Sequence, residues 1–355
     1  MTILKIRGGD LDLVEYDFTS FQPGEHVNTC GFEGTYPLSI SQKPVKTQAP
    51  GRIHLTVLDM NRFAPGQPGG GGIGFAIDVF AEVEVTCIDE GFKIDYSRPA
   101  IISHFLSVFS KTVGYFGGFI VRAKDHDYKH VGLGSTSTIL TALSAAVNRA
   151  VGDPLSLDQL RILIGNNYVE ETQEGMVAYG FETGVGPAVS SRGGMAILGD
   201  NLTLVYQHPF AEGKHVHIVI PPSSISSAGE EEFSLLMNKA RSLDYRDREL
   251  KAYIVMMDFI PALNKGDLRK MGDSMWEMEF RGSKRAEIEH HSFELYQYMH
   301  KLRKAGLEFI GMSSVGPSIA VITDMSRESI SSLLRPLHLE TAVSTRVNNT
   351  GLVYL

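Results

Sequence analysis

The sequence predicts an α+β protein in two parts, and three observations lead to this prediction. In the first half of the chain, glycine-rich turns separate short segments in which apolar and polar residues alternate, as in strands. Its centre holds a strand, a glycine-rich loop and a helix in direct succession. In the second half, a clear strand over 215–220 precedes four segments of helical pattern. Because 355 residues suffice for two domains, we place a break near residues 206–215.

We expect three regions along the chain. Residues 1–48 form an N-terminal extension of extended strands, with alternation over 2–7 and 11–18. Residues 49–208 form an N-terminal domain with a phosphate loop. Residues 209–355 form a C-terminal α/β domain.

The first strands of the N-terminal domain surround a glycine run. The strand over 49–59 has one polar face, because apolar residues alternate there with polar ones such as His54. Five of the six residues over 69–74 are glycines. They indicate either a flexible linker or backbone packed beside a ligand. A long strand over 75–88 follows.

A glycine-rich loop separates the apolar strand 118–122 from an Ala- and Leu-rich helix over 139–149. Glycine permits a positive φ and a close approach to an anion, and the first free N–H groups of a helix point at such an anion. The alternative is an ordinary helix N-cap behind a glycine turn. The loop is neither a Walker A motif, since no Lys follows its second glycine, nor a GxGxxG motif. The predicted phosphate-binding residues are His130, Gly132, Leu133, Gly134, Ser135, Thr136 and Ser137.

Helical patterns flank this loop and dominate the second half. Apolar residues recur at helical spacing over 98–114, and a further helix is predicted over 157–170. A second glycine-rich loop, 176–187, precedes strands predicted over 188–198 and 202–206. The later predicted elements are helices over 230–240, 249–263, 267–280 and 284–305, strands over 307–312 and 318–323, and a terminal strand over 352–355.

Charge and composition exclude several classes of protein. The net charge of −8 argues against a general nucleic-acid surface and against binding to an anionic membrane. Two cysteines, Cys30 and Cys87, make neither a disulfide framework nor a zinc site. The early Gly8-Gly9-Asp10 interrupts any signal peptide, and no apolar run is long enough for a bilayer. We therefore expect a cytoplasmic protein, and a homodimer as its assembly.

Three segments resemble motifs of the GHMP kinase superfamily. The segment 49–55, Ala-Pro-Gly-Arg-Ile-His-Leu, resembles its first motif, and 130–136, His-Val-Gly-Leu-Gly-Ser-Thr, resembles its central glycine-rich motif. The segment 312–318, Met-Ser-Ser-Val-Gly-Pro-Ser, resembles its third. The resemblance runs from about residue 49 to the C-terminus and implies a two-domain GHMP-kinase-like fold. In detail the chain is most similar to the branch of β-ribofuranosylaminobenzene 5′-phosphate synthases, which act in methanopterin biosynthesis.

The loop 180–187 favours this branch over the kinases. GHMP kinases usually have a catalytic aspartate there, whereas this loop contains no Asp and its nearest acid is Glu182. A kinase uses the aspartate to orient or deprotonate the attacking hydroxyl. A synthase that acts on phosphoribosyl pyrophosphate needs instead an anion cradle with Mg²⁺ and a site for an aromatic acid.

The candidate site residues have distinct expected roles. Arg52 and His54 form a polar patch for a carboxylate or phosphate, or else are a surface arginine and a core histidine. Asp59 and Glu182 can offer carboxylate oxygens to Mg²⁺, or serve as a cap or a salt-bridge partner. We predict these four residues as catalytic, and Ser135 with Asp59 as the metal site. The residues expected beside the substrate are Gly72, Gly74, Gly184, Gly186, Ser313, Ser314 and Gly316.

The leading functional hypothesis is a glycosyltransferase. It joins the ribose phosphate of phosphoribosyl pyrophosphate to 4-aminobenzoate or 4-hydroxybenzoate, and the resemblance implies that CO₂ and pyrophosphate are released. The second hypothesis is an ATP-dependent small-molecule kinase that uses the same loop. The third is a metabolite-binding protein that kept the loop without the chemistry.

Overall fold

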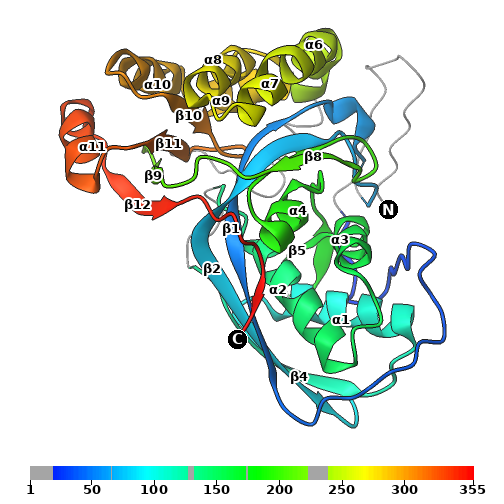
Figure 1. The fold of residues 1–355 in the computed structure, drawn as a ribbon. Coiled ribbons are helices and arrows are strands. Elements are labelled where there is room, and N and C mark those ends of the chain that lie inside the picture. The colour runs from blue at the N-terminus through cyan, green and yellow to red at the C-terminus, as the bar shows by residue number, and fades with distance from the viewer. Residues whose placement is uncertain (1–18, 65, 127–131, 173–174, 223–238) are drawn as a thin grey trace.

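The described residues form two large β-sheets, each covered by helices, and one small two-stranded sheet (Figure 1). This computed structural model describes residues 19–64, 66–126, 132–172, 175–222 and 239–355. A seven-stranded sheet belongs to the first half of the chain, and a four-stranded sheet to the second. A short two-stranded hairpin lies beside them. The predicted α+β class is confirmed.

The larger sheet is built around two long antiparallel strands, β1 and β2. The order is β13-β1-β2-β4-β3, with β7 pairing β2 and β8 pairing β7. Only β3 and β4 are parallel. Its strands are β1 (Val45–Val57), β2 (Gly72–Ile88), β3 (Phe92–Asp95), β4 (Gly118–Lys124), β7 (Met195–Leu198), β8 (Leu204–His208) and β13 (Val353–Tyr354).

The helices of the first half are α1 (Pro99–Val113), α2 (Ser135–Ala150), α3 (Leu157–Asn166) and α4 (Val185–Arg192). Three helices, α1, α2 and α4, pack on the larger sheet, and α3 packs on these helices. In α2 only Arg149 is not buried, and small Ala, Ser and Thr side chains let it lie close to the sheet and to its neighbours. The hairpin of β5 (Val169–Glu171) and β6 (Val177–Tyr179) follows α3.

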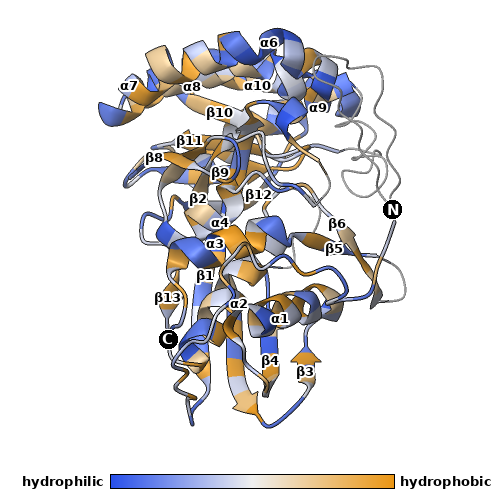
Figure 2. Ribbon diagram, turned by 90° about the vertical axis from the view of Figure 1, so that its right-hand side faces the viewer, coloured by the Kyte–Doolittle hydropathy of each residue, from blue (hydrophilic) through white to orange (hydrophobic). Residues whose placement is uncertain are grey.

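The smaller sheet has the order β10-β11-β9-β12, and all its neighbours are antiparallel. Figure 2 shows the helices of residues 241–304 gathered at one end of the molecule, away from α1 and α2. The strands are β9 (His215–Val219), β10 (Phe309–Met312), β11 (Ile319–Thr323) and β12 (Thr341–Arg346). The helices are α6 (Arg241–Ile254), continued by a π-helical turn (Val255–Phe259) into α7 (Ile260–Asn264), α8 (Leu268–Glu279), α9 (Gly282–His291), α10 (Glu294–Lys304) and α11 (Arg327–Leu334).

The chain leaves the larger sheet after β8 and enters the smaller one at β9, within the predicted break. The last strand, β13, returns and pairs with β1, so the C-terminus is part of the larger sheet. Residues 45–48 belong to β1. The described part of the extension packs on the first half, where Phe21 pairs with Val177 and the Gly24 N–H donates to His104 Nδ1.

Several local predictions differ from the structure. Residues 185–192 form helix α4, so the strand predicted over 188–198 is reduced to β7. The alternation of small residues there mimics a strand over too short a length to reveal helical spacing. The helix predicted over 284–305 breaks at Ser292, which has extended φ and ψ. The sequence did not predict β3, β5, β6, β12 and α11. The strands predicted over 2–7 and 11–18, and most of the helix over 230–240, lie outside the described residues.

No helix among the described residues is long and apolar enough to cross a membrane.

Candidate active site

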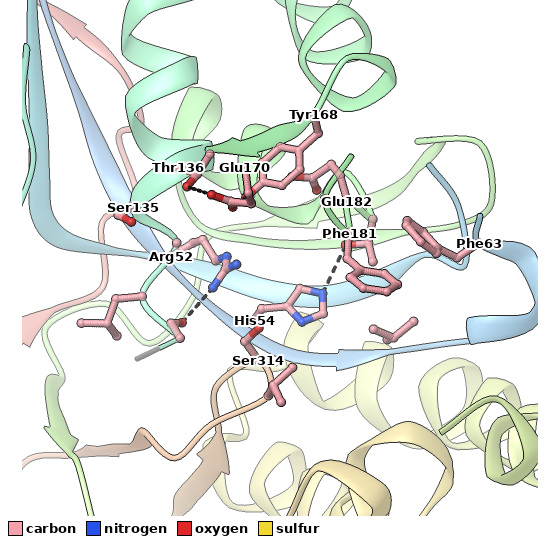
Figure 3. Close-up of a pocket in the computed structure, with 18 of the residues that line it drawn as sticks. Arg52, His54, Phe63, Ser135, Thr136, Tyr168, Glu170, Phe181, Glu182 and Ser314 are labelled. Carbon is pink, nitrogen blue, oxygen red and sulfur yellow. Dashed lines mark hydrogen bonds between the residues drawn. The ribbon is translucent and has the colours of Figure 1, made fainter. Parts of the chain in front are cut away.

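A cleft opens between the two sheets, and residues from both halves line it. The first half supplies β1, the start of α2, the β5–β6 hairpin and the loop before α4; the second half supplies α9 and the β10–β11 loop. The space not filled by protein atoms, with its open mouth, is about 1260 Å³. Figure 3 shows that it has a polar end at Ser135 and Glu170 and an apolar end at Phe63 and Phe181.

The predicted phosphate loop lies at the polar end. Helix α2 begins at Ser135, four residues before the Ala- and Leu-rich segment that predicted it, and Gly134 precedes it with a φ of 73°. A Cβ atom at Gly134 would lie 2.7 Å from Arg52 Cγ, so only glycine fits without displacing that arginine. No side chain caps the helix, and Ser135 and Thr136 line the cleft. The positive end of the α2 dipole therefore faces the cleft.

A second helix begins beside the first. Gly184, with a φ of 88°, precedes α4, and Gly186 in its first turn lines the cleft. A Cβ atom at Gly186 would lie 2.4 Å from Ser137 Oγ, so glycine allows the two helix starts to touch. The cleft thus has two helix N-termini in one wall, which favours a ligand with several negative charges.

Arg52 and His54 project from β1 toward the cleft (Figure 3). Arg52 Nη1 donates to the Gly132 carbonyl oxygen at 2.8 Å. His54 is buried, and its Nε2 lies 3.2 Å from Thr183 Oγ1. Burial and the charge of Arg52 hold the pKa of His54 well below its usual range. His54 is therefore neutral near pH 7, and Arg52 carries the positive charge of the predicted patch.

Glu182 lines the cleft from the loop before α4. Its Oε1 accepts from the Gly184 N–H at 2.6 Å. Burial raises the pKa of Glu182 to about 7, while the Gly184 hydrogen bond and the Arg52 charge oppose that rise. This carboxyl can change its protonation state near physiological pH.

A hydrogen-bonded network around Glu170 was missed by the sequence analysis. Glu170 Oε2 accepts from Thr136 Oγ1 at 2.9 Å, and its Oε1 accepts from the Tyr168 hydroxyl at 2.7 Å. The Arg98 guanidinium donates to Thr136 Oγ1 at 2.6 Å and to Ser135 Oγ at 3.1 Å. Arg98 therefore fixes both hydroxyls at the start of α2, and places a cation behind a loop that has no lysine after its second glycine. The only sequence signal was the acidic pattern at 168–172.

The β10–β11 loop carries the third motif into the cleft. Ser314 and Gly316 line it, and the Ser314 N–H donates to the His54 carbonyl oxygen at 2.7 Å. Ser313 is buried behind them. Its Oγ donates to the Gly132 carbonyl oxygen at 2.6 Å and accepts from the His54 N–H at 3.2 Å. Ser313 thus joins the three motifs to one another, which is a supporting role rather than contact with substrate.

The apolar end of the cleft was also missed. Phe63 follows a short 3₁₀ turn (Met60–Arg62), Phe181 follows β6, and their ring centroids are 4.5 Å apart. Val57, Met60 and Val315 complete this apolar wall. Two phenylalanine rings in contact beside a polar pocket are suited to an aromatic ring.

Several predicted site residues lie elsewhere. The Asp59 carboxylate caps the 3₁₀ turn by accepting from the Asn61 N–H at 2.9 Å, and lies 3.7 Å from Arg248, outside the cleft lining. Gly72 and Gly74 lie in β2, where a Cβ atom would strike His54 or Val185, so they support the site from behind. Gly184 holds Glu182 rather than lining the cleft. His130 lies outside the described residues. Those residues contain no group of three or more His, Cys, Asp or Glu side chains placed to hold a metal.

Two curated proteins are similar to the chain over most of its length. The β-ribofuranosylphenol 5′-phosphate synthase of Archaeoglobus fulgidus is 25% identical over 333 residues, covering 86% of this chain and 98% of that protein. The synthase of the same name from Methanothermobacter thermautotrophicus is 26% identical over 296 residues, covering 78% and 87%. No protein-family model matches the chain.

Solved structures share the fold. Homoserine kinase from Cytophaga hutchinsonii has a TM-score of 0.62 at 15% identity, covering 89% of this chain and 99% of that one. Mevalonate diphosphate decarboxylase from Staphylococcus aureus has a TM-score of 0.63 at 17% identity, covering 88% and 98%. Both curated relatives are named as synthases, which supports an enzyme of the transferase type. The chain thus has the fold expected for the GHMP kinase superfamily and is similar in sequence to β-ribofuranosylphenol 5′-phosphate synthases.

Proposed function

We propose that the protein transfers the ribose phosphate of phosphoribosyl pyrophosphate to 4-hydroxybenzoate or 4-aminobenzoate, and releases pyrophosphate and CO₂. The observation that carries this proposal is the division of one cleft into an anion-binding end and an apolar, aromatic end. A pyrophosphate suits two helix N-termini, and a benzoate ring suits Phe63 and Phe181. The names of the two curated relatives and the lack of an Asp in 180–187 agree with it.

The donor end has oxygen ligands that suit Mg²⁺. Glu170 and the hydroxyls of Ser135 and Thr136 meet at the start of α2, and hard cations prefer such oxygens. We assign these three residues to the metal in place of Asp59, whose carboxylate is engaged as a cap. When bound, Mg²⁺ would neutralise the leaving pyrophosphate. Arg98, which is paired with Asp125 and Glu170, holds these two hydroxyls in place behind the same loop.

The acceptor end pairs charge with apolar surface. Arg52, on β1, is placed to receive the benzoate carboxylate, because a buried carboxylate must be paired. The ring then packs against the phenylalanines. In the proposed reaction the ring carbon that bears the carboxylate bonds to C1 of the ribose as the bond from C1 to pyrophosphate breaks. CO₂ then leaves and its bonding electrons return to the ring.

An ATP-dependent small-molecule kinase is the second candidate, and Glu182 is the observation that favours it. A buried carboxyl with a pKa of about 7 matches a general base for a hydroxyl acceptor. The proposed phosphoribosyl transfer needs no such base, because no C–H bond is broken.

One assay separates the two functions. The protein is incubated with Mg²⁺, phosphoribosyl pyrophosphate and either 4-hydroxybenzoate or 4-aminobenzoate, and pyrophosphate and CO₂ are measured. We expect both products in equal amounts, and none without the aromatic acid. Consumption of ATP that depends on a hydroxylated metabolite, without pyrophosphate from phosphoribosyl pyrophosphate, would establish the kinase instead.

A further inference from the structure

A buried ion pair from the second half of the chain faces the cleft. Glu287, on α9, is 2% exposed and lines the cleft, and Lys284, one turn earlier, is fully buried. The Lys284 Nζ lies 2.6 Å from Glu287 Oε2 and donates to the Ser314 carbonyl oxygen at 2.6 Å. The pair therefore connects α9 to the β10–β11 loop.

Stability alone does not account for this pair. Removing two charges from water costs several kcal/mol per ion, and apolar side chains of similar volume are often as stable or more so. A carboxylate can accept about four hydrogen bonds, and the contact with Lys284 uses one. Burial raises the pKa of Glu287, and the Lys284 ammonium opposes that rise by favouring the ionised carboxylate, which only accepts. Glu287 can therefore accept a hydrogen bond from a ligand.

The chemistry of the proposed reaction decides which part of the acceptor meets Glu287. The bond forms at the ring carbon that bears the carboxylate, so that end of the acid faces the donor at the start of α2. The substituent at position 4 then points the opposite way, toward the apolar end. Ala286, next to Glu287, packs there with Phe63 and Val315. Glu287 approaches this end from α9, whereas Glu182, which follows Phe181, approaches it from the loop before α4 and has its Oε1 engaged by the Gly184 N–H.

We propose that Glu287 accepts a hydrogen bond from the 4-hydroxyl or 4-amino group of the aromatic acid and so selects acceptors with a donor at position 4. This inference rests on the proposed function. A negative acceptor at that group increases its electron donation to the ring, which raises the electron density at the carbon that attacks C1. The aromatic acid need not lose a proton from its 4-substituent. When CO₂ leaves, the electron pair of the broken C–C bond stays on the ring and restores its aromaticity.

Binding measurements test this without turnover. Calorimetry with Mg²⁺ and pyrophosphate present compares 4-hydroxybenzoate with 4-methoxybenzoate, which has no donor at position 4. We expect the wild type to prefer the hydroxyl compound, and Glu287→Gln to lose about 10- to 100-fold in affinity for it while binding the methoxy compound as before. Glu287→Asp should restore part of the preference. Glu289→Gln is the matched control, because Glu289 lies on the same helix and pairs with Lys239 and Arg285.

A second variant guards against misfolding. Lys284→Met combined with Glu287→Leu removes both charges of this pair together, and it should fold and lose the same preference. Equal losses for both compounds, or an unchanged preference in either variant, would overturn the role of Glu287. A wild type that prefers the hydroxyl compound but releases no pyrophosphate with any benzoate would instead overturn the proposed reaction, and would leave the binding role intact.

Discussion

Arg52 is the residue on which the acceptor assignment depends most. It lies between the two glycine-led helix starts and carries the positive charge of its strand face. Arg52→Ala should raise the KM for the aromatic acid by roughly 10- to 100-fold, because a buried carboxylate loses a charged hydrogen-bond partner. The KM for phosphoribosyl pyrophosphate should change much less. Steady-state kinetics with each substrate varied in turn measure both.

Arg192→Ala is the control for this variant, since Arg192 lies on the exposed end of α4 and pairs with Asp158. It should leave both KM values unchanged. If Arg52→Ala raises the KM for phosphoribosyl pyrophosphate as much as the KM for the aromatic acid, Arg52 holds the loop in shape through Gly132 and does not bind the acid.

The raised pKa of Glu182 predicts that kcat/KM depends on pH. The proposed transition state carries positive charge at C1 of the ribose, and an ionised carboxylate in the cleft stabilises it. Because the pKa of Glu182 is about 7, kcat/KM should rise as the pH increases through 7 and level off roughly one pH unit higher. Glu182→Gln should lower the rate and abolish the rise of kcat/KM with pH. Glu182→Asp keeps a carboxyl group and should keep such a rise. An unaltered profile in Glu182→Gln would assign the titration to another group.

At the scale of single residues, the sequence indicated the polar end of the cleft but not its apolar end. Arg52, His54 and Ser135 belong to motifs whose glycines mark close approach, so they could be found. Phe63, Phe181 and Glu287 come from segments that meet only in the folded chain, and each looks locally like an ordinary apolar or surface residue. Asp59 shows the reverse error, because a cap and a metal ligand use the same carboxylate and differ only in surroundings.

At the scale of elements, the start of α2 was predictable and the start of α4 was not. In α2 a long Ala-rich stretch follows Gly134 and Ser135, and its length makes the helical pattern clear. Helix α4 has eight residues, begins Val-Gly-Pro and ends at Gly193, so its sequence suggests a loop and a strand. Its position against Ser137 depends on tertiary packing at Gly186.

Phosphate binding at the start of α2 can be tested by replacing Gly134, with Gly213 as the matched control. Gly134 and Gly213 both have positive φ, so alanine costs about 1–2 kcal/mol of backbone strain at either. Only at Gly134 would the new Cβ strike another residue, Arg52; at Gly213 it meets nothing within 4 Å. Gly134→Ala should therefore weaken binding of phosphoribosyl pyrophosphate by at least about tenfold, measured by calorimetry with Mg²⁺. Gly213→Ala should bind as the wild type does.

Equal affinities in the two variants would show that the loop before α2 is structural only. A loss of folding in both, seen by circular dichroism, would point to strain rather than to the displaced arginine.

At the scale of the whole molecule, the sequence shows where the pattern of elements changes, but not the pairings that join distant parts of the chain. The change from glycine-rich strands to a strand followed by helices marks the passage from β8 to β9. Two sets of contacts link residues that are far apart in the chain. Strand β13 pairs with β1, and Ser313 forms hydrogen bonds with Gly132 and His54. No local pattern encodes such contacts. The homodimer stays a prediction.

The global stability should depend on pH through a carboxyl outside the cleft lining. Glu279, at the end of α8, is fully buried and accepts from the Met312 N–H at 2.9 Å. Burial raises its pKa from 4.5 to about 8, and the nearby Lys284 opposes this. Between pH 4.5 and about 8, Glu279 binds more protons in the folded state than in the unfolded state. The contribution of Glu279 to the free energy of unfolding therefore falls as the pH rises.

Glu279→Gln removes this titration and keeps an acceptor for the Met312 N–H. Relative to this variant, the wild type should lose roughly 3–5 kcal/mol of unfolding free energy from pH 4.5 to 8, since each pKa unit corresponds to about 1.4 kcal/mol. Denaturant unfolding at several pH values measures the difference. Glu277→Gln, on the same helix but paired with Arg281 in solvent, should change stability by less than about 1 kcal/mol at every pH. Parallel curves for the wild type and Glu279→Gln would mean that Glu279 does not titrate in this range, and that Lys284 holds it ionised throughout.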